Sequence, residues 1–215
     1  MNMSVKIKVF FDYVCPFCYL EYHSLKKAME GRDVEVEYYP KELRRPPKPK
    51  VDPMHDEMRL KRFDEVLKPA AEKLGIPMKL PYISPHPYTT DTFLGFLYAE
   101  HQGKGTEYTE KIFQIFYVEE QDIGEISVLR KAAEEIGLDG AAFEEEIRSQ
   151  KRLEELDSYK AWADAYEIVS LPTMIVEEEK VVGYHEPEEY AGIIDRTALA
   201  GSGMHCDADG NCGNN

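Results

Sequence analysis

Two cysteines separated by two residues stand in the segment Cys15–Cys18, which reads Cys-Pro-Phe-Cys. The apolar run Val5–Phe11 precedes them and predicts a short buried strand, and helical spacing of apolar residues follows from Pro16 to about Met29. This junction places Cys15 at a helix N-terminus, where unpaired N–H groups and the helix dipole favour thiolate over thiol. The predicted chemistry is attack of a thiolate on a disulfide.

The two cysteines are expected to differ in role. Cys15 is predicted to be an exposed attacking thiolate, and Cys18, one helical turn later and more enclosed, the thiol that resolves the mixed disulfide. Pro16 presets φ at the first helical position and has no N–H that would be left unpaired. Phe17 offers an apolar surface for substrates.

Charge and composition exclude some classes of partner. The 215 residues include 26 basic and 41 acidic side chains, a net charge of −15, so neither nucleic acid nor an anionic membrane is expected as a partner. The basic, Pro-rich cluster 41–50 is interpreted as a solvent-exposed loop rather than an anion site. No signal peptide or membrane-spanning run is visible, and we expect a cytoplasmic protein. In a reducing compartment a CxxC is more often catalytic or metal-binding than a structural disulfide.

The remaining pattern predicts strand, helix, strand, a long helical block, then helix, strand, strand, helix. The expected parts are 1–45 (βαβ with the cysteine pair), 46–150 (a helical insertion), 151–200 (αββα) and 201–215 (a flexible tail). Within the insertion, Pro69 is expected to kink or break a helix. Asp91, Thr106 and Asp139 are expected to cap helices.

This order of elements resembles the thioredoxin fold, and the helical block makes it similar to the DsbA family. More narrowly, Asp12–Tyr19 resembles the FrnE-like branch, whose members carry Asp-Tyr-Val-Cys-Pro-aromatic-Cys-Tyr. The resemblance extends through Ala71–Ile76, Thr89–Leu97, Gly103-Lys104, Leu129–Leu138 and Leu171–Thr173, over residues 5 to 200. It implies an α/β protein with a thioredoxin-like fold and a large all-helical insertion.

The same resemblance implies a site and an activity. Leu171–Pro172 should be a cis peptide bond facing the cysteine pair, with Pro172 counted among the catalytic residues beside Cys15 and Cys18. Substrate would bind along Pro16, Phe17 and the free backbone of Leu171. The implied activity is thiol–disulfide exchange with protein or small-molecule substrates, with glutathione or a thioredoxin-type reductant as partner and no organic cofactor. A monomer or homodimer is expected.

One position departs from the founding DsbA members, which have His where this chain has Phe17. A His can add a hydrogen-bond donor and a positive charge near the thiolate, and Phe cannot. The resemblance therefore implies a less oxidising dithiol than theirs.

Two other classes stay open. Glutathione-dependent 2-hydroxychromene-2-carboxylate isomerases and kappa-class glutathione transferases look similar around the motif, but they typically carry Ser where this chain has Cys15. A non-catalytic zinc protein would need Cys206 and Cys212 to join the first cysteine pair around the metal. The leading interpretation includes no metal.

The tail cysteines Cys206 and Cys212 resemble a second pair near the C-terminus of some FrnE-like proteins, which makes them candidates for an auxiliary dithiol. Further side chains are candidates for lining a substrate groove, each also compatible with ordinary packing: Tyr13, Tyr19, His86, Tyr88, Thr89 and His185.

Overall fold

The computed structural model describes residues 4–201, 204–206 and 212–214. Four strands form a mixed sheet in the order β2–β1–β3–β4: β1 (Val5–Phe11), β2 (Val34–Pro40), β3 (Thr173–Val176) and β4 (Glu179–Val182). β1 is parallel to β2 and antiparallel to β3, which is antiparallel to β4. Phe10 pairs with Thr173, so the end of β1 that leads into Cys15 lies beside the start of β3.

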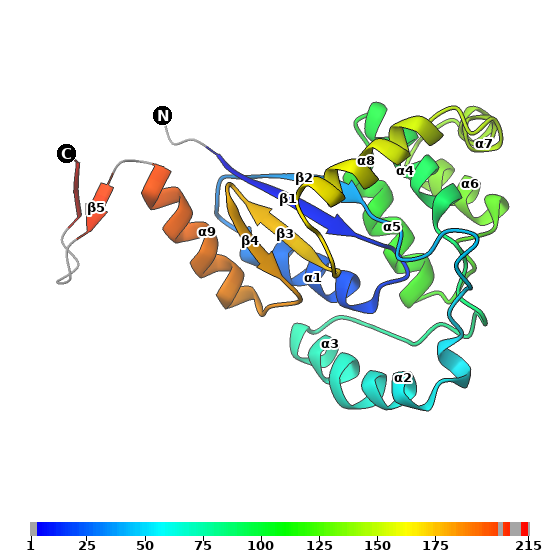
Figure 1. Ribbon diagram of the computed structural model, residues 1–215, viewed down its shortest axis with the longest axis horizontal. Coiled ribbons are helices and arrows are strands. Elements are labelled where there is room, and N and C mark those ends of the chain that lie inside the picture. The colour runs from blue at the N-terminus through cyan, green and yellow to red at the C-terminus, as the bar shows by residue number, and fades with distance from the viewer. Residues whose placement is uncertain (1–3, 202–203, 207–211, 215) are drawn as a thin grey trace.

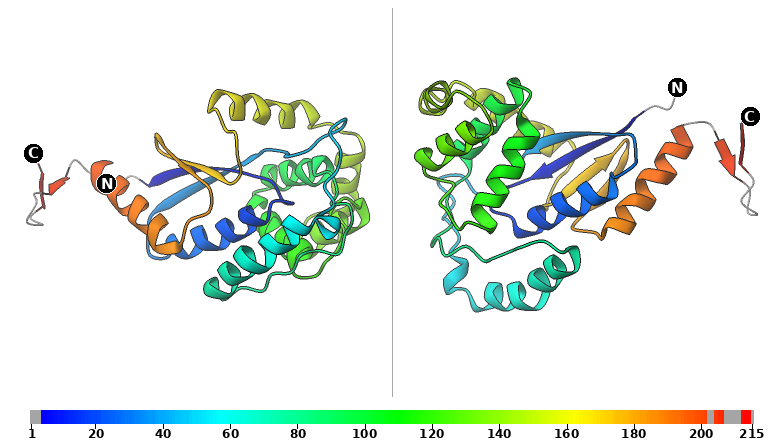
Figure 2. Two further views of the ribbon diagram at one scale, coloured as in Figure 1. Left: turned by 60° about the horizontal axis from the view of Figure 1, so that its bottom comes forward. Right: turned by 180° about the vertical axis from the view of Figure 1, so that it is seen from behind.

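Helices cover both faces of this sheet (Figure 2). α1 (Pro16–Ala28) and α9 (Pro187–Gly201) pack together on one face, and α8 (Leu153–Ala165) lies on the other. Phe10 and Ile175 pack toward α8, where they form a small buried cluster with Ala163. This arrangement confirms the predicted α/β class.

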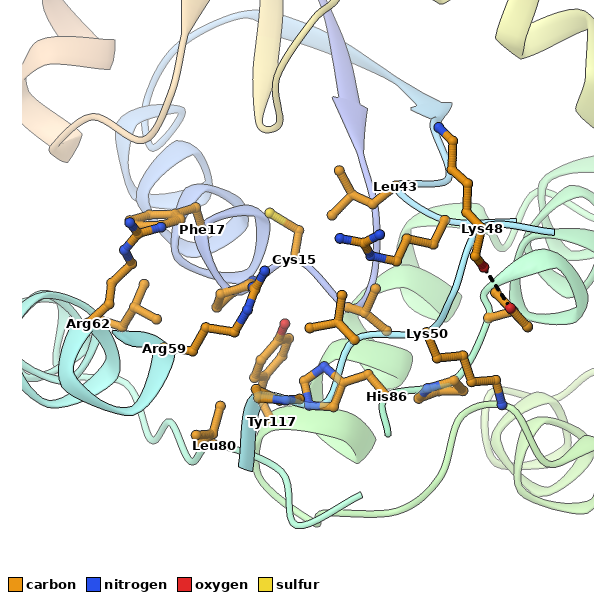
Figure 3. A pocket seen from close by; sticks show the side chains of 18 residues that line it. Cys15, Phe17, Leu43, Lys48, Lys50, Arg59, Arg62, Leu80, His86 and Tyr117 are labelled. Carbon is orange, nitrogen blue, oxygen red and sulfur yellow. Dashed lines mark hydrogen bonds between the residues drawn. The ribbon is translucent and has the colours of Figure 1, made fainter. Parts of the chain in front are cut away.

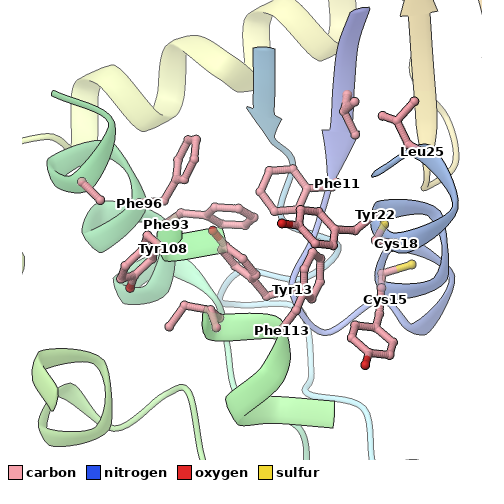
Figure 4. Close-up of a cluster of buried hydrophobic side chains, with 14 of the residues drawn as sticks. Phe11, Tyr13, Cys15, Cys18, Tyr22, Leu25, Phe93, Phe96, Tyr108 and Phe113 are labelled. Carbon is pink, nitrogen blue, oxygen red and sulfur yellow. The ribbon is translucent and has the colours of Figure 1, made fainter. Parts of the chain in front are cut away.

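The segment between β2 and α8 is all helical (Figure 1). It contains η1 (Pro53–His55), α2 (Glu57–Arg62), η2 (Phe63–Leu67), α3 (Lys68–Leu74), α4 (Thr90–His101), α5 (Gly105–Tyr117), α6 (Ile126–Glu135) and α7 (Gly140–Arg148). α3 packs beside α1, and α4 to α7 gather at one end of the sheet. Phe11 of β1 joins these parts, because its ring lies 5.4 Å from that of Phe93 and 6.1 Å from that of Phe113 (Figure 4).

Of the two outcomes expected at Pro69, a kink or a break, the break does not occur. Pro69 follows a π-helical turn, Phe63–Leu67, in which the Lys68 N–H donates to the Phe63 carbonyl. A turn with this wider hydrogen-bond spacing accommodates the ring and the missing N–H of proline without ending the helix.

Of the three expected helix caps, only Asp139 is confirmed: its carboxylate accepts hydrogen bonds from the N–H groups of Ala141 and Ala142. α4 and α5 begin earlier than expected, with Thr89 and Lys104 as their N-cap residues, so Asp91 and Thr106 lie inside the helices.

The tail contains a two-stranded antiparallel sheet, β5 (Met204–Cys206) and β6 (Cys212–Asn214), whose register pairs the backbones of Cys206 and Cys212. The side chains of both cysteines fall outside the part of the chain that is described, so their predicted auxiliary redox role stays a prediction. In the described residues, no helix has the length and apolar character needed to cross a bilayer.

Candidate active site

The cysteine pair stands where the sequence predicts it. Cys15 is the N-cap residue of α1, with φ −89° and ψ 112°, and Pro16 is the first helical residue. The Cys15 N–H donates to the Asp12 carbonyl at 3.1 Å, and the Cys18 N–H donates to the Cys15 carbonyl at 3.0 Å. Both thiols are free.

Cys15 is less accessible than expected, with 5% of its surface exposed against 2% for Cys18. The reason is the turn before β3, which places the Leu171 carbonyl oxygen 3.8 Å from the Cys15 sulfur. Access to the thiol is instead through a pocket that Cys15 helps to line.

The Leu171–Pro172 peptide bond is cis, as the resemblance implies. Pro172 is buried, and its carbonyl accepts a hydrogen bond from the Gly183 N–H at 2.9 Å. In the described part of the chain, the Leu171 N–H donates no hydrogen bond. The backbone beside the cysteine pair therefore has an unused donor.

The environment of Cys18 favours its protonated form. Burial raises the pKa of the Cys18 thiol well above its ordinary value, and the adjacent Cys15 sulfur and Glu21 carboxyl raise it further. Cys18 thus stays a thiol under conditions in which an ordinary cysteine begins to ionise.

Two buried carboxyl groups next to the motif were not singled out from the sequence. Burial raises the pKa of Asp12 to about 7, partly offset by the Leu43 N–H, which donates to its carboxylate at 2.7 Å. Burial, and then Cys15, raise the pKa of Glu21 well above its ordinary value. The signal for Glu21 was present: it lies three residues after Cys18, on the buried face of α1.

A pocket of about 480 Å³ opens beside Cys15 (Figure 3). Of the predicted substrate-binding and groove residues, Pro16, Phe17, His86 and Tyr88 line it. Leu171 lies beside Cys15 but is not among the lining residues. The remaining candidates do not line the pocket: Tyr13, Tyr19, Thr89 and His185. The Tyr13 and Tyr19 hydroxyls bond instead to the Thr109 hydroxyl and the Pro77 carbonyl, at 3.1 and 2.6 Å. Tyr117, unremarked in the sequence, also lines the pocket.

The basic cluster 41–50 is largely solvent-exposed, as expected, but part of it also lines the pocket, which the sequence does not predict. Arg44, Lys48 and Lys50 line the pocket, and Arg59 and Arg62 of α2 join them. The loop after β2 is attached to the segment before α1, because the N–H groups of Lys41 and Leu43 donate to the Phe11 carbonyl and the Asp12 carboxylate. Its cations thereby reach the site, an arrangement that depends on tertiary folding and leaves no local pattern.

Among the described residues, no group of three or more His, Cys, Asp or Glu side chains is placed to hold a metal ion. A zinc site formed with Cys206 and Cys212 would use side chains beyond that part of the chain.

The mixed sheet, the flanking helices and the cysteine pair at the start of α1 define a thioredoxin-like protein with a helical insertion. The chain belongs to the DSBA-like thioredoxin domain family, whose sequence model matches residues 6–195. A relative, the uncharacterized protein YwbO of Bacillus subtilis, is 42% identical over 183 residues, which cover 84% of this chain and 91% of that protein.

Solved structures share this fold at low sequence identity. A probable DsbA oxidoreductase from Streptomyces coelicolor has a TM-score of 0.81 at 18% identity, covering 98% of this chain and 99% of its own. A 2-hydroxychromene-2-carboxylate isomerase has a TM-score of 0.78 at 21% identity, covering 92% and 98%. The cytosolic disulfide reductase DsbM of Pseudomonas aeruginosa, solved with GSH, has a TM-score of 0.68 at 18% identity, covering 89% and 98%.

Proposed function

We propose that the protein is a thiol–disulfide oxidoreductase that uses the Cys15–Cys18 dithiol. The observation that carries the proposal is the contrast between the two thiols. Cys15 stands at the N-terminus of α1 on the wall of an open pocket, whereas burial and its neighbours hold the pKa of Cys18 high. This contrast suits a first attack by Cys15 and a later one by Cys18.

The exchange has two steps. The Cys15 thiolate attacks one sulfur of a substrate disulfide, forms a mixed disulfide and releases the first substrate thiol. Cys18 then loses its proton and attacks the Cys15 sulfur, which releases the second thiol and leaves a Cys15–Cys18 disulfide. Two electrons pass from the protein to the substrate, and the reverse sequence oxidises a substrate dithiol.

The residues around the pair have supporting roles in this proposal. The free Leu171 N–H, next to Pro172, pairs with the backbone of an extended substrate, and Pro16 and Phe17 contact its side chains. A glutathione- or thioredoxin-type partner returns the dithiol to its starting state. The expected setting is the cytoplasm.

A second candidate is a glutathione-dependent isomerase, because a 2-hydroxychromene-2-carboxylate isomerase shares the fold. That chemistry has no need of a resolving thiol. Glutathione-dependent isomerase activity that survives Cys18→Ser would favour it over disulfide exchange.

The test is to trap the mixed disulfide with the neutral reagent bis(2-hydroxyethyl) disulfide, followed by mass spectrometry of the intact protein and its peptides. Cys18→Ser should accumulate the adduct on Cys15, since the second step is blocked, and the wild type should proceed to the internal disulfide. Cys15→Ser should form neither. If Cys15→Ser reacts at Cys18 as fast as the wild type reacts at Cys15, the proposed order of attack is wrong.

A further inference from the structure

The pocket beside Cys15 concentrates positive charge in an acidic protein. Its lining contains five cations, Arg44, Lys48, Lys50, Arg59 and Arg62, and no Asp or Glu. The chain as a whole has 26 basic and 41 acidic side chains, so random sampling of its surface would place more carboxylates than cations around a site. The lining therefore presents a local positive potential.

Most of this charge is not neutralised by the protein. Of the five cations, only Arg59 forms an ion pair within the described residues, to Asp56 at 3.0 Å. The Lys50 ammonium stands over the Tyr88 ring at 5.1 Å, and Arg44 donates a long hydrogen bond of 3.5 Å to the Pro49 carbonyl. These contacts leave the net charge of both side chains available to a ligand.

The pocket also contains buried polar atoms whose hydrogen-bonding capacity is unused. The Tyr117 hydroxyl and the His86 Nε2 have no hydrogen-bond partner in the described residues, although the two side chains are only 1% and 8% exposed. Burial, and then the charge of Arg59, lower the pKa of His86 to about 4, so the ring is neutral at pH 7. An unsatisfied buried polar atom lowers the stability of the protein, and a ligand that bonds to it removes this loss.

These groups surround the reactive thiol. Figure 3 shows the Arg59 side chain and the Tyr117 hydroxyl directed toward the Cys15 side of the pocket, with Arg62 beside Phe17. Lys48 and Lys50 lie across from Arg59 and Arg62, on the loop that follows β2. The cations thus approach a ligand at Cys15 from two separate segments of the chain.

We propose that this pocket selects a small disulfide or thiol that carries at least two separated anionic groups and no ammonium group. Guanidinium forks bind carboxylate or phosphate oxygens through paired hydrogen bonds. The lining has no carboxylate to receive an ammonium group. Glutathione, which has two carboxylates and one ammonium, is therefore predicted to be a poorer substrate than a fully anionic molecule. The selection rests on the proposed function for its sulfur chemistry.

The reaction at this site conserves atoms and electrons. An anionic disulfide and the Cys15–Cys18 dithiol give two molecules of the anionic thiol and the Cys15–Cys18 disulfide, with both protons carried by the released thiols. The cations take no part in bond making, and they hold the substrate anions while its sulfur lies against Cys15.

The test compares three dialkyl disulfides of similar length with different charge: dianionic 3,3′-dithiodipropionate, neutral bis(2-hydroxyethyl) disulfide and dicationic cystamine. The measured quantity is the ratio of second-order rate constants, anionic to neutral, because this ratio cancels changes in the nucleophilicity of Cys15. The wild type should react fastest with the dianion and slowest with the dication. Added salt should lower the anionic-to-neutral ratio.

Variants assign the preference to the pocket. Arg44→Gln/Arg62→Gln should lower the anionic-to-neutral ratio about tenfold. Lys131→Gln, which removes a cation from exposed α6 outside the pocket lining, should leave it unchanged. Glutathione disulfide should react with a lower second-order rate constant than dithiodipropionate. A comparison of oxidised coenzyme A with pantethine, which lacks the charged phosphates of coenzyme A, measures the preference for phosphate. A preference for carboxylate or for phosphate supports the proposal.

Equal ratios in the wild type and the double variant, or cystamine reacting as fast as the dianion, would overturn the proposal. Such a result would leave the oxidoreductase function intact if the neutral disulfide still reacts in a Cys15-dependent manner. If the neutral disulfide also fails to react, both the anion selection and the oxidoreductase function are wrong.

Discussion

Asp12 links the cysteine motif to the loop that brings cations to the site. Its backbone carbonyl accepts from the Cys15 N–H, and its side chain accepts from the Leu43 N–H of the loop after β2. The carboxyl group is 1% exposed, and burial raises its pKa to about 7. A carboxyl group that keeps its proton up to about pH 7 thus lies at the junction between β1 and α1.

This raised pKa makes a prediction about stability. In the unfolded chain Asp12 ionises near its ordinary value of 3.8, whereas in the folded protein it holds its proton until about pH 7. The unfolded state therefore releases this proton first, and the contribution of Asp12 to stability falls as pH rises between these values. Asp12→Asn keeps an acceptor for Leu43 but cannot ionise.

We expect Asp12→Asn to gain about 3 kcal/mol of stability relative to the wild type between pH 4.5 and pH 7.5. Urea denaturation of both proteins at the two pH values measures this gain, and the difference cancels the other titrating groups. Parallel changes in the two proteins would contradict the shifted pKa of Asp12.

At the scale of elements, the helical insertion depends on close packing of α4 against α5 and α7. A Cβ added at Gly95 of α4 would lie 2.6 Å from the Phe143 ring of α7 and would also clash with the Tyr108 hydroxyl of α5. Gly192 of α9 is a matched helical position with nothing within 4 Å of its added Cβ. The two glycines thus separate close packing from intrinsic helix propensity.

Gly95→Ala should lower the free energy of unfolding by about 1–3 kcal/mol, because the core must shift to accept the methyl group. Gly192→Ala should raise it by about 0.5–1 kcal/mol, since alanine is the better helix former. Chemical denaturation with far-UV circular dichroism checks both. A stabilised Gly95→Ala protein would mean that α4 does not pack closely against the Phe143 ring and the Tyr108 hydroxyl.

The elements were largely predictable because most follow a local pattern. β1, α1 and the hairpin β3–β4 follow from apolar periodicity, and Asp139 caps its helix in the usual way. The continuous helix through Pro69 was not predictable, since a π-helical turn leaves no residue signature. The starts of α4 and α5 were each misplaced by two residues because Asp91 and Thr106 are favourable cap types that the fold does not use as caps.

For the molecule as a whole, one hydrophobic core joins the sheet, α1, α9 and the helical insertion. Phe11 is central to it, through edge-on ring contacts with Phe93 and Tyr13 at 5.4 and 5.0 Å. The insertion therefore packs on the end of the sheet as an integral part of the protein. A separate buried cluster, in which Leu67, Ala71 and Leu74 pack with Leu20 of α1, holds the segment that contains α2 beside the start of α1.

The site was predictable only where one short motif carries it. The positions of Cys15 and Cys18 followed from the motif, and the cis bond before Pro172 followed from the resemblance to the DsbA family. The five cations of the pocket come from the loop after β2 and from α2, whose relation to Cys15 is set by long-range packing. Tyr117 appears as an ordinary helix residue until folding places it beside the thiols, whereas the helical spacing of Glu21 from Cys18 was a signal in the sequence.

The most direct test of the account is the redox equilibrium of Cys15–Cys18 across a series of glutathione buffers, read by thiol trapping and peptide mass spectrometry. A working dithiol should show a reversible two-electron transition in the wild type that maps to the Cys15–Cys18 peptide and disappears in Cys15→Ser. Peptide mapping separates it from any change at Cys206 and Cys212. If both active-site thiols stay free across the whole series, the protein has no working dithiol and the oxidoreductase account is wrong.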